Sequence, residues 1–520
     1  MEADGKGKNT TRHFRGVVVA VSLALVFYGV CVTWDYYIDD VFIHLQYARN
    51  VAQGRGFVFS EGEKPSYGVT SPLWVWVLAA VQPAGIRHPE LPSKAIGWAA
   101  SFVNLLLLAA ISRRLLGWLG RSPWWTLLAL TIWGTNPGVV RWQNAGMETP
   151  LFITLVLVIL LLHRPLSKQT WWRTIVMGLV MGALFLLRPE GMFLCAAYAL
   201  VALWAVLAGP RRMRVFWMAT VTGLCWIAVA LPWLIYSRVV FGTIVPNTVL
   251  AKGVVMGIAS RPQYLLGLGK VILQVALVES LLIALGALVW FRKGFPRTGR
   301  LKEHREEVAL WIAFIVVFAM AYYLCSGYVL SRYYVVLMPC VLLVAVLALD
   351  QIFPVGLSRR RVAMWLTTLV ALVLAWGVGV TVTVLIPHVR GCEVGNERLK
   401  DLALEARAVA HPGDAVVICD IGIFAYYSGL RVIDLVGLVT RKVVSLDGAK
   451  EDYLLKRRPR FAMLHSHQGA EFTEAYGSCL HELSRVHYPV DTLLGRRGED
   501  YVLSEVDWKQ VDEIRAHTAP

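Results

Sequence analysis

Long apolar runs alternate with short polar connections along most of the chain. A helical run of about 20 apolar residues matches the thickness of a bilayer core. The first run extends from about 16 to 34, and further spans are predicted at 94–116, 123–139, 150–163, 174–187, 191–209, 215–238, 267–291, 308–325, 334–353 and 362–386. The pattern predicts an all-α polytopic membrane protein with about eleven spans.

The first apolar run follows a basic start, as a secretory signal would. Lys6, Lys8, Arg12 and Arg15 precede it. Its length and the lack of a small-residue cleavage site favour an uncleaved membrane helix.

Lysine and arginine are concentrated in every second connection, and this bias predicts the orientation. The basic connections contain Arg113, Arg114 and Arg121, then Arg164, Lys168 and Arg173, then Arg211, Arg212 and Arg214, then the run 292–305, then Arg359, Arg360 and Arg361. Cytoplasmic loops carry such an excess, so the N-terminus is expected in the cytoplasm. The alternation holds only if the short apolar stretch 73–81 does not cross. We therefore interpret it as a juxtamembrane or re-entrant helix in one large outer loop, about 35–93.

The chain becomes polar after the last predicted span. Residues 1–387 are expected to form the transmembrane domain, and residues 388–520 a small extracytoplasmic α/β domain. Short strands are predicted at 415–420 and 431–434, because both are rich in β-branched residues. The stretch 421–428 between them is predicted as a helix or turn that Gly429 closes.

The eight cysteines include no Cys-x-x-Cys pair. Five of them lie in or beside apolar runs, where cysteine behaves as a small buried hydrophobic residue. Cys392, Cys419 and Cys479 lie in the polar C-terminal part. A bridge between Cys392 and Cys479 is an open alternative, because sequence does not fix connectivity.

The composition agrees with a membrane protein: 57% of residues are hydrophobic, 17% are charged, and the net charge is +16. The cations are spread between apolar runs, which argues against nucleic-acid binding. No Walker-type loop and no Gly-x-Gly-x-x-Gly after a strand is present, so no ATP or dinucleotide site is indicated. The sequence requires no cofactor, although a divalent cation is compatible with it.

An adjacent pair of acids, Asp39 and Asp40, directly follows the first span. Two neighbouring carboxylates repel each other, which raises one pKa and leaves that group suited to act as a base. The pair is also suited to hold a divalent cation, with Asp40 as the metal ligand. The alternative is a solvated helix start, where aspartate is common.

Other polar groups, most of them ionisable, fall in connections that the topology places on the same outer side. They are Arg141 and Glu148, then Arg188 and Glu190, then Arg238, Asn247 and Lys252, and finally Arg332. A single cation at a membrane boundary is usually a snorkelling side chain. Acids and cations gathered on one face instead suggest a site for a phosphate-bearing lipid and a nucleophile.

These motifs resemble, in their order, the GT-C superfamily of membrane glycosyltransferases, and most of all the terminal arabinofuranosyltransferases of mycobacterial and corynebacterial cell walls. The resemblance covers about residues 16–350. The shared features are Asp39-Asp40, Arg49-Asn50, the stretch 54–59, Gly62-Glu63, Thr70-Ser71, the Gly-x-Glu at 146–148, the Arg-Pro-Glu at 188–190, the stretch 245–252 and Arg332. The arabinosyl enzymes carry an acidic stretch before that last arginine, whereas residues 325–332 here contain no acid.

The resemblance implies a polyprenyl-phosphate-linked sugar as donor, an envelope glycan, lipid or protein as acceptor, and transfer with inversion on the outer face. It implies a catalytic role for Asp39 and Asp40: by its place in the motif Asp39 is expected to be the base, with Asp40 assisting it or binding a metal, and which of the two carboxylates takes the proton stays open. Binding of the donor phosphate or substrate is expected from Arg188, Lys252, Arg332, Glu148, Glu190 and Asn247. The donor sugar stays open between arabinofuranose and a hexose.

Two other functions are compatible with the sequence. A transporter or flippase of lipid-linked sugars would favour internal repeats, and none is visible. A structural subunit would bind through residues 388–520. In the transferase hypothesis this part is expected to position an acceptor glycan, and the alternative for its Asp420, Asp434, His465 and His467 is that they are surface or fold residues.

Overall fold

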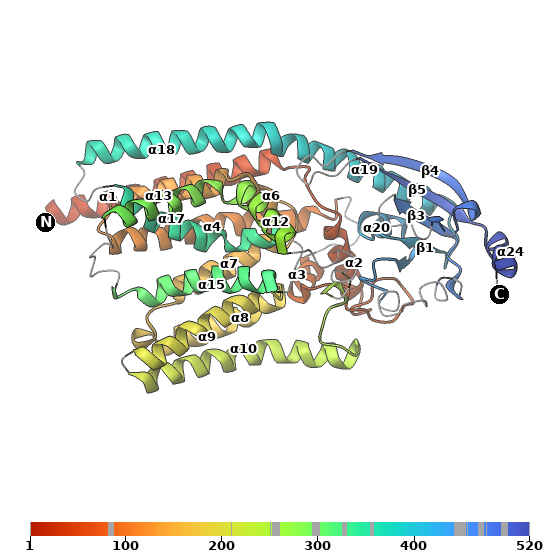
Figure 1. The fold of residues 1–520 in the computed structure, drawn as a ribbon, viewed down its shortest axis with the longest axis horizontal. Helices are drawn as coiled ribbons and strands as arrows, with labels where there is room; N and C mark the ends of the chain where they lie inside the picture. Colours follow the sequence, from red (N-terminus) through yellow and green to blue (C-terminus); the bar gives the residue numbers. More distant parts are fainter. Residues whose placement is uncertain are drawn as a thin grey trace. The chain divides into compact units, whose positions relative to one another are not determined.

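The computed structural model describes residues 2–81, 88–209, 211–249, 251, 261–293, 302–324, 330–353, 358–440, 454, 456–465, 473, 474, 476–489 and 498–518. The chain divides into two compact units (Figure 1). Unit 1 comprises Met1–Trp34, Lys94–Trp233 and Ala259–Thr383. Unit 2 comprises Asp35–Ser93, Leu234–Ile258 and Val384–Pro520, so it combines the large loop after the first span with the polar C-terminal part.

The described residues of unit 1 form helices that run side by side in Figure 1. They are α1 (Glu2–Val32), α4 (Leu91–Trp118), η1 (Pro123–Trp125), α5 (Thr126–Thr135), α6 (Pro137–Gln143), α7 (Thr149–Leu162), η2 (Leu166–Lys168), α8 (Trp171–Leu187), α9 (Gly191–Ala208), α10 (Arg212–Val240), α12 (Arg261–Val275), α13 (Leu277–Lys293), α15 (Arg305–Leu324), α16 (Ser331–Tyr334), η3 (Val335–Leu337), α17 (Met338–Ile352), α18 (Arg359–Val380) and η4 (Thr381–Leu385). Every span predicted from hydropathy coincides with one or more of these helices.

The described helices confirm a mostly helical, multi-pass membrane protein with a small C-terminal sheet. Seven of them are long and apolar enough to cross a bilayer, or eight if the bent pair α12–α13 counts as one span. Helices α7 and α8 are apolar but shorter than 18 residues. The expected total of eleven stays a prediction.

Two predicted spans are broken, and the same side chain stabilises both breaks. The span 123–139 is interrupted at Asn136, whose side chain accepts hydrogen bonds from the N–H groups of Gly138 and Val139 at the start of α6. The span 267–291 bends by 100° between α12 and α13. Asn136 Nδ2 donates to the carbonyl of Val275 at that bend (2.6 Å). Backbone groups freed inside an apolar layer need such partners.

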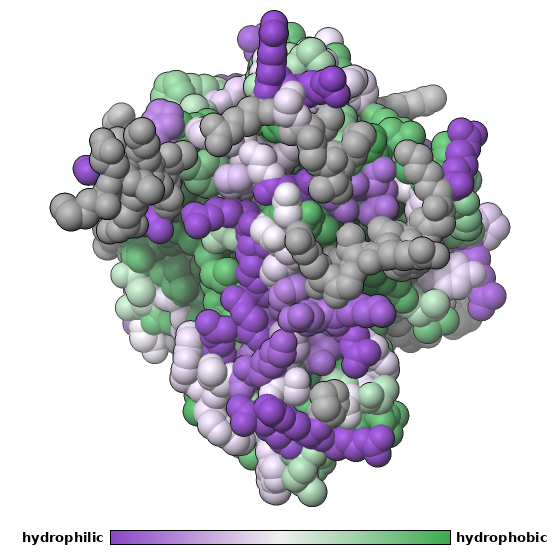
Figure 2. Space-filling model, turned by 90° about the vertical axis from the view of Figure 1, so that its left-hand side faces the viewer, coloured by the Kyte–Doolittle hydropathy of each residue, from purple (hydrophilic) through white to green (hydrophobic). Residues whose placement is uncertain are grey.

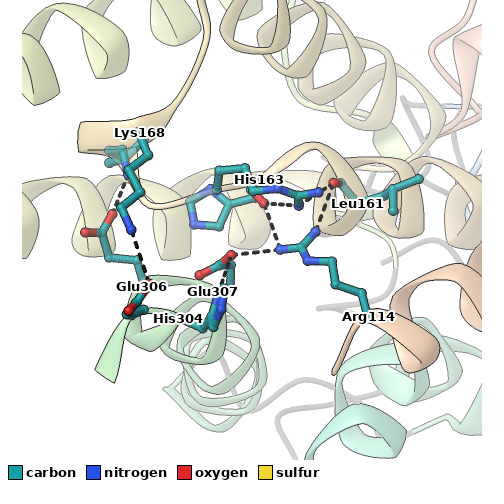
Figure 3. A network of polar contacts seen from close by, with 10 residues as sticks. Arg114, Leu161, His163, Lys168, His304, Glu306 and Glu307 are labelled. Carbon is teal, nitrogen blue, oxygen red and sulfur yellow. Dashed lines mark hydrogen bonds and ion pairs between the residues drawn. The ribbon is translucent and has the colours of Figure 1, made fainter. Parts of the chain in front are cut away.

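Polar side chains gather at the end of unit 1 where α1 begins (Figure 2). Arg114 of α4 donates to Glu307 of α15 (2.7 Å) and to the carbonyls of Leu161 and His163 at the end of α7 (Figure 3). The Glu307 side chain is 1% exposed. The backbone N–H of Leu166 donates to Glu306 (2.6 Å). These contacts hold α4, α7 and α15 together at the end of unit 1 where α1 begins, which we call the basic end.

Unit 2 contains a five-stranded mixed sheet in the order β2-β1-β3-β5-β4. Its elements are α2 (Asp40–Ala52), α3 (Pro72–Val81), α19 (Ile386–Val409), β1 (Ala415–Ile418), α20 (Ile423–Ser428), β2 (Arg431–Asp434), β3 (Phe461–His465), η5 (Gly477–Cys479), β4 (Leu480–Tyr488), β5 (Glu499–Val506) and α24 (Trp508–Thr518). Strands β2, β1 and β3 are parallel, and β5 runs antiparallel to β3 and β4. The strands predicted at 415–420 and 431–434 are confirmed as β1 and β2.

Local predictions in unit 2 also agree with the structure. The stretch 421–428 contains α20, and Gly429 closes that helix with a left-handed φ of 68°. The apolar stretch 73–81 is the short helix α3, packed against α2. The bridge between Cys392 and Cys479 is not formed, since both cysteines are free. Cys479 lies in the apolar core of the sheet, whereas the Cys392 thiol lies beside the His388 ring.

Candidate functional site

Asp39 lies immediately before α2, but it does not cap that helix. Its backbone is already helical, and its side chain makes no capping bond to α2. Its carboxylate instead accepts hydrogen bonds at the start of α20, from the N–H groups of Gly422 (2.9 Å) and Ile423 (2.7 Å). The interpretation of Asp39 as a solvated start of its own helix is therefore wrong. Helix α2 lies beside α20 in this unit (Figure 1).

The surroundings of Asp39 favour its protonated form. Burial raises the pKa of Asp39 to about 7, and the charges of Asp420 and Asp40 act in the same direction. The two backbone N–H donors oppose this shift because they stabilise the carboxylate. A carboxyl with a pKa near neutrality is suited to general-base catalysis, since it is both available and basic enough.

A second polar cluster follows the carboxyl ends of the parallel strands. Asp420 follows β1 and accepts a hydrogen bond from the Tyr501 hydroxyl (2.5 Å). His465 ends β3, with Nε2 at 3.6 Å from Asp420 and Nδ1 at 2.8 Å from Glu499. The His465 side chain is only 5% exposed, and among the described residues neither of its ring nitrogens makes a regular hydrogen bond. Asp420 thus links this cluster electrostatically to Asp39.

From the sequence, Asp420 and His465 are interpreted as surface or fold residues, and neither is related to Asp39. Asp420 and Gly422 directly follow a predicted strand, where turns often carry functional groups. No sequence pattern connects them to a residue more than 380 positions earlier. Asp434 has a structural role, since its buried carboxylate accepts from the N–H groups of Val436 and Val439. His467 lies outside the described residues.

Three other predicted site residues belong to the segments of unit 2. Asp40 is the first residue of α2, and its carbonyl lies 3.0 Å from His44 Nδ1. Asn247 is buried, its N–H donates to the carbonyl of Tyr67 (2.9 Å), and its side chain donates to Leu438. Asn247 therefore connects the 234–258 segment to the large loop after the first span. Lys252 lies outside the described residues.

The remaining predicted residues converge in unit 1. Arg188 follows α8 and pairs with Glu190 (2.8 Å) and Glu148 (3.6 Å). The guanidinium groups of Arg188 and Arg332 lie 5.3 and 5.2 Å from the centre of the Tyr333 ring. We call Glu148, Arg188, Glu190, Arg332 and Tyr333 the arginine cluster. The sequence predicted four of its members, and Tyr333 is added by the structure.

In the arginine cluster the positive and negative charges nearly cancel. The side chains of Arg188 and Glu148 are each 5% exposed, so neither charge is well solvated. The Tyr322 hydroxyl adds a hydrogen bond to Glu190 (3.1 Å). Because two carboxylates accompany two arginines, an anionic ligand would have to share these cations with the acids. Arg332 donates to the Tyr333 hydroxyl (3.2 Å) and is the more accessible of the two arginines.

The described residues contain no group of three or more His, Cys, Asp or Glu side chains that could hold a metal ion. The arrangement around Asp39 therefore does not resemble a built metal centre. The role of Asp40 as a metal ligand stays a prediction, and no chemical step below depends on it.

Comparison with known proteins gives the fold. No curated protein matches the sequence. Residues 392–513 match the family described as Domain of unknown function (DUF8728). Among solved structures, the chain is similar to ArnT from Cupriavidus metallidurans bound to undecaprenyl phosphate, with a TM-score of 0.60, 13% identity, and coverage of 95% of this chain and 98% of that one. The chain has the GT-C fold.

An archaeal structure with the GT-C fold is also similar. The Archaeoglobus fulgidus oligosaccharyltransferase, solved with a tethered acceptor peptide, has a TM-score of 0.55 and 10% identity. The match covers 86% of this chain and 69% of that one. The same archaeal protein, AglB, has been solved with an inhibitory peptide and a dolichol-phosphate, and that structure matches with a TM-score of 0.54 and 11% identity. At these identities the likeness establishes the fold alone.

Proposed function

We propose that the chain is a membrane glycosyltransferase that moves a sugar from a polyprenyl-phosphate donor to a cell-envelope acceptor, with inversion. The observation that carries this proposal is the carboxylate of Asp39, held by two backbone N–H groups and poised to titrate near neutrality. The GT-C fold supports it, because ArnT and AglB with this fold were solved with polyprenyl and dolichyl phosphates. The donor sugar is arabinofuranose or a hexose, and the acceptor is a glycan, lipid or protein.

In the proposed reaction, Asp39 removes the proton from an acceptor hydroxyl. The hydroxyl oxygen attacks the anomeric carbon of the donor sugar while the bond to the phosphate oxygen breaks. A single displacement of this kind inverts the anomeric centre, and the lipid phosphate leaves with the electron pair. One base and cations for the leaving phosphate are sufficient for such a transfer.

The other predicted residues take supporting roles in the proposal. Arg332 and Arg188 bind the donor phosphate, with Lys252 as a further cation. Glu148 and Glu190 orient Arg188, and their ion pairs with Arg188 support this role. Asp40 assists Asp39, and Asn247 holds the 234–258 segment that precedes Lys252.

The proposed setting is the plasma membrane, with the N-terminus in the cytoplasm and residues 388–520 outside. Its support is the alternation of basic connections together with the polar end of unit 1 (Figure 2). In that orientation the large first loop, which carries Asp39, faces the extracytoplasmic side.

The test is transfer by the purified full-length protein. Polyprenyl-phosphoryl arabinofuranose and polyprenyl-phosphoryl hexoses are incubated separately with glycan acceptors, and the products are resolved by mass spectrometry and NMR. We expect one donor to be consumed with inversion, and Asp39→Asn to reduce the rate by about 10²–10⁴-fold, the usual contribution of a general base. Full transfer by both Asp39→Asn and Asp40→Asn would exclude the proposed site. Movement of intact lipid-linked sugar across vesicles, without cleavage, would favour a transporter.

A further inference from the structure

A polar pocket of about 500 Å³ opens within unit 2, apart from the bonds around Asp39. Its walls come from the second half of α2, the chain after it, the end of α19 with the turn that follows, and the start of β2. This volume is within the usual range for pockets that bind small molecules, about 300–1,000 Å³. No role for this pocket follows from the proposed transfer chemistry itself.

Four arginines line the pocket: Arg49, Arg55, Arg407 and Arg431. Arg55 pairs with Glu61 (3.2 Å), and Arg431 Nε lies 3.7 Å from Glu63. Within the part of the chain that the structure describes, Arg49 and Arg407 have no carboxylate at ion-pair distance. Two carboxylates, Glu61 and Asp414, line the pocket with the four arginines, and Asp414 pairs with Arg460 (2.9 Å), so the lining keeps an excess of positive charge.

Arg49 is held in place before any ligand arrives. Its guanidinium donates to the side-chain oxygen of Gln46 (2.5 Å) and lies 4.6 Å from the centre of the Tyr426 ring. Gln46 is fixed in turn by donating to the carbonyl of Phe59 (2.8 Å). Burial lowers the pKa of Arg49, and the charges of Arg55 and Arg407 act in the same direction. An anion would relieve this repulsion, and a pre-positioned guanidinium loses little entropy in binding it.

The lining favours a saccharide anion over a lipid. Gln46, Asn50, Ser60 and Ser428 provide amide and hydroxyl groups that suit sugar hydroxyls. The apolar lining is restricted to small or single side chains, namely Ala410, Pro412 and Leu430, which offer no surface for an acyl chain. The planar guanidinium of arginine presents paired N–H donors that match two oxygens of a carboxylate or a phosphate.

Helix α2 connects this pocket to the proposed base. It begins at Asp40, directly after Asp39, and Arg49 lies nine residues further along. Asp39 and Arg49 are ten residues apart, which at about 1.5 Å per residue is about 15 Å along the helix axis. A saccharide of a few units could therefore present one hydroxyl at Asp39 while another unit lies in the pocket.

We propose that this pocket binds a carboxylate or phosphate group on the acceptor saccharide, through Arg49 and Arg407. The proposal rests on the function assigned above to Asp39. It names the acceptor class as an acidic glycan and makes the pocket a specificity site that is separate from the transfer chemistry.

The experiment measures binding to the full-length protein in detergent by saturation-transfer NMR and calorimetry. The probes are glucuronate, glucose 6-phosphate, glucose and inorganic phosphate. We expect at least one of the two acidic sugars to bind and glucose not to bind. Arg407→Gln should weaken that binding about tenfold, as expected for the loss of one charge-assisted hydrogen bond. The matched control is Arg390→Gln, an exposed arginine on the same helix that does not line the pocket, and it should leave binding unchanged.

The outcomes separate the two proposals. Tighter binding of glucuronate would identify the acidic group of the acceptor as a carboxylate. Tighter binding of glucose 6-phosphate would identify it as a phosphate. Inorganic phosphate binding as tightly as both sugars, or equal losses in Arg407→Gln and Arg390→Gln, would overturn the saccharide site. Asp39→Asn should keep normal binding of the acidic sugar while it loses transfer. If Asp39→Asn transferred sugar normally but Arg407→Gln still lost binding, the proposed base would be wrong and the pocket would stand.

Discussion

The N–H group of Gly422 donates a hydrogen bond of 2.9 Å to the carboxylate of Asp39. Glycine has no side chain, so the backbone at Gly422 can approach the Asp39 side chain this closely. A Cβ on Gly422 would collide with the carbonyl and carboxyl atoms of Asp39. We expect Gly422→Ala to displace Asp39 and to reduce transfer about 100-fold, since small misplacements of catalytic groups have such effects. Steady-state transfer kinetics measure this change.

The control for that substitution is Gly477→Ala in the same unit. A Cβ there meets its nearest atom at an ordinary contact distance of 3.6 Å, from Thr473. This variant should keep the wild-type rate. Wild-type activity in Gly422→Ala would show that the contact between Asp39 and α20 does not matter for function.

The acid limb of the pH–rate profile should reflect the titration of the Asp39 carboxyl. Because its pKa is raised to about 7, the active carboxylate forms as the pH rises through that value, so kcat/KM should increase towards alkaline pH. Asp420→Asn removes one of the charges that raise this pKa, so the limb should move to lower pH. Asp512→Asn, which affects only an exposed pair with Arg458, should leave the limb in place. An unshifted limb in Asp420→Asn would separate Asp420 from the base.

The same carboxyl has a predictable effect on stability. Asp39 binds its proton more tightly in the folded state than at its ordinary pKa of 3.8. Its contribution to stability is therefore fully present at low pH and is lost as the pH rises from about 4 to about 7. Asp39→Asn should flatten the pH dependence of thermal stability in this window. A variant whose profile matched the wild type would indicate that the carboxyl is not buried in this way.

The two arginines of the arginine cluster should respond differently to substitution. Arg188→Gln leaves the buried carboxylate of Glu148 and the partly buried carboxylate of Glu190 without this cation, so it should destabilise the protein by about 3–5 kcal/mol. Arg332→Gln should keep the melting temperature but weaken donor binding, because Arg332 is more accessible. Thermal unfolding and donor binding, measured on both variants, test this division. Equal donor affinity in Arg332→Gln and the wild type would remove Arg332 from the phosphate site.

The ion pair between Arg114 and Glu307 should be important for stability and not for transfer. It joins α4 to α15 at the basic end of unit 1, and Glu307 is 1% exposed there (Figure 3). Glu307→Ala leaves Arg114 facing carbonyls alone, at an expected cost of about 3–5 kcal/mol. The exposed pair between Lys168 and Glu303 is the control, and Glu303→Ala should change stability by less than about 1 kcal/mol. Equal melting temperatures in the two variants would contradict this expectation.

The sequence by itself determined the membrane class and most of the helices. The thickness of the bilayer sets how many consecutive apolar residues a membrane helix needs, and such runs are visible in the local sequence. Every predicted span therefore coincides with helices. The strands β1 and β2 and the glycine stop after α20 were predicted for the same reason, because turn and strand preferences act over a few residues. The breaks at Asn136 and between α12 and α13 were missed, because the apolar pattern continues through both.

Only the tertiary structure decided what Asp39 contacts. The sequence placed it next to Asp40 and left open a helix cap, whereas the fold brings Gly422, Ile423 and Asp420 to it from a position more than 380 residues away. The same holds for Tyr333 between Arg188 and Arg332, and for the four arginines around one pocket. Local pattern carries no information about such pairings, because they are set by how distant segments pack. The pKa of a carboxyl depends on that packing through burial and neighbouring charge.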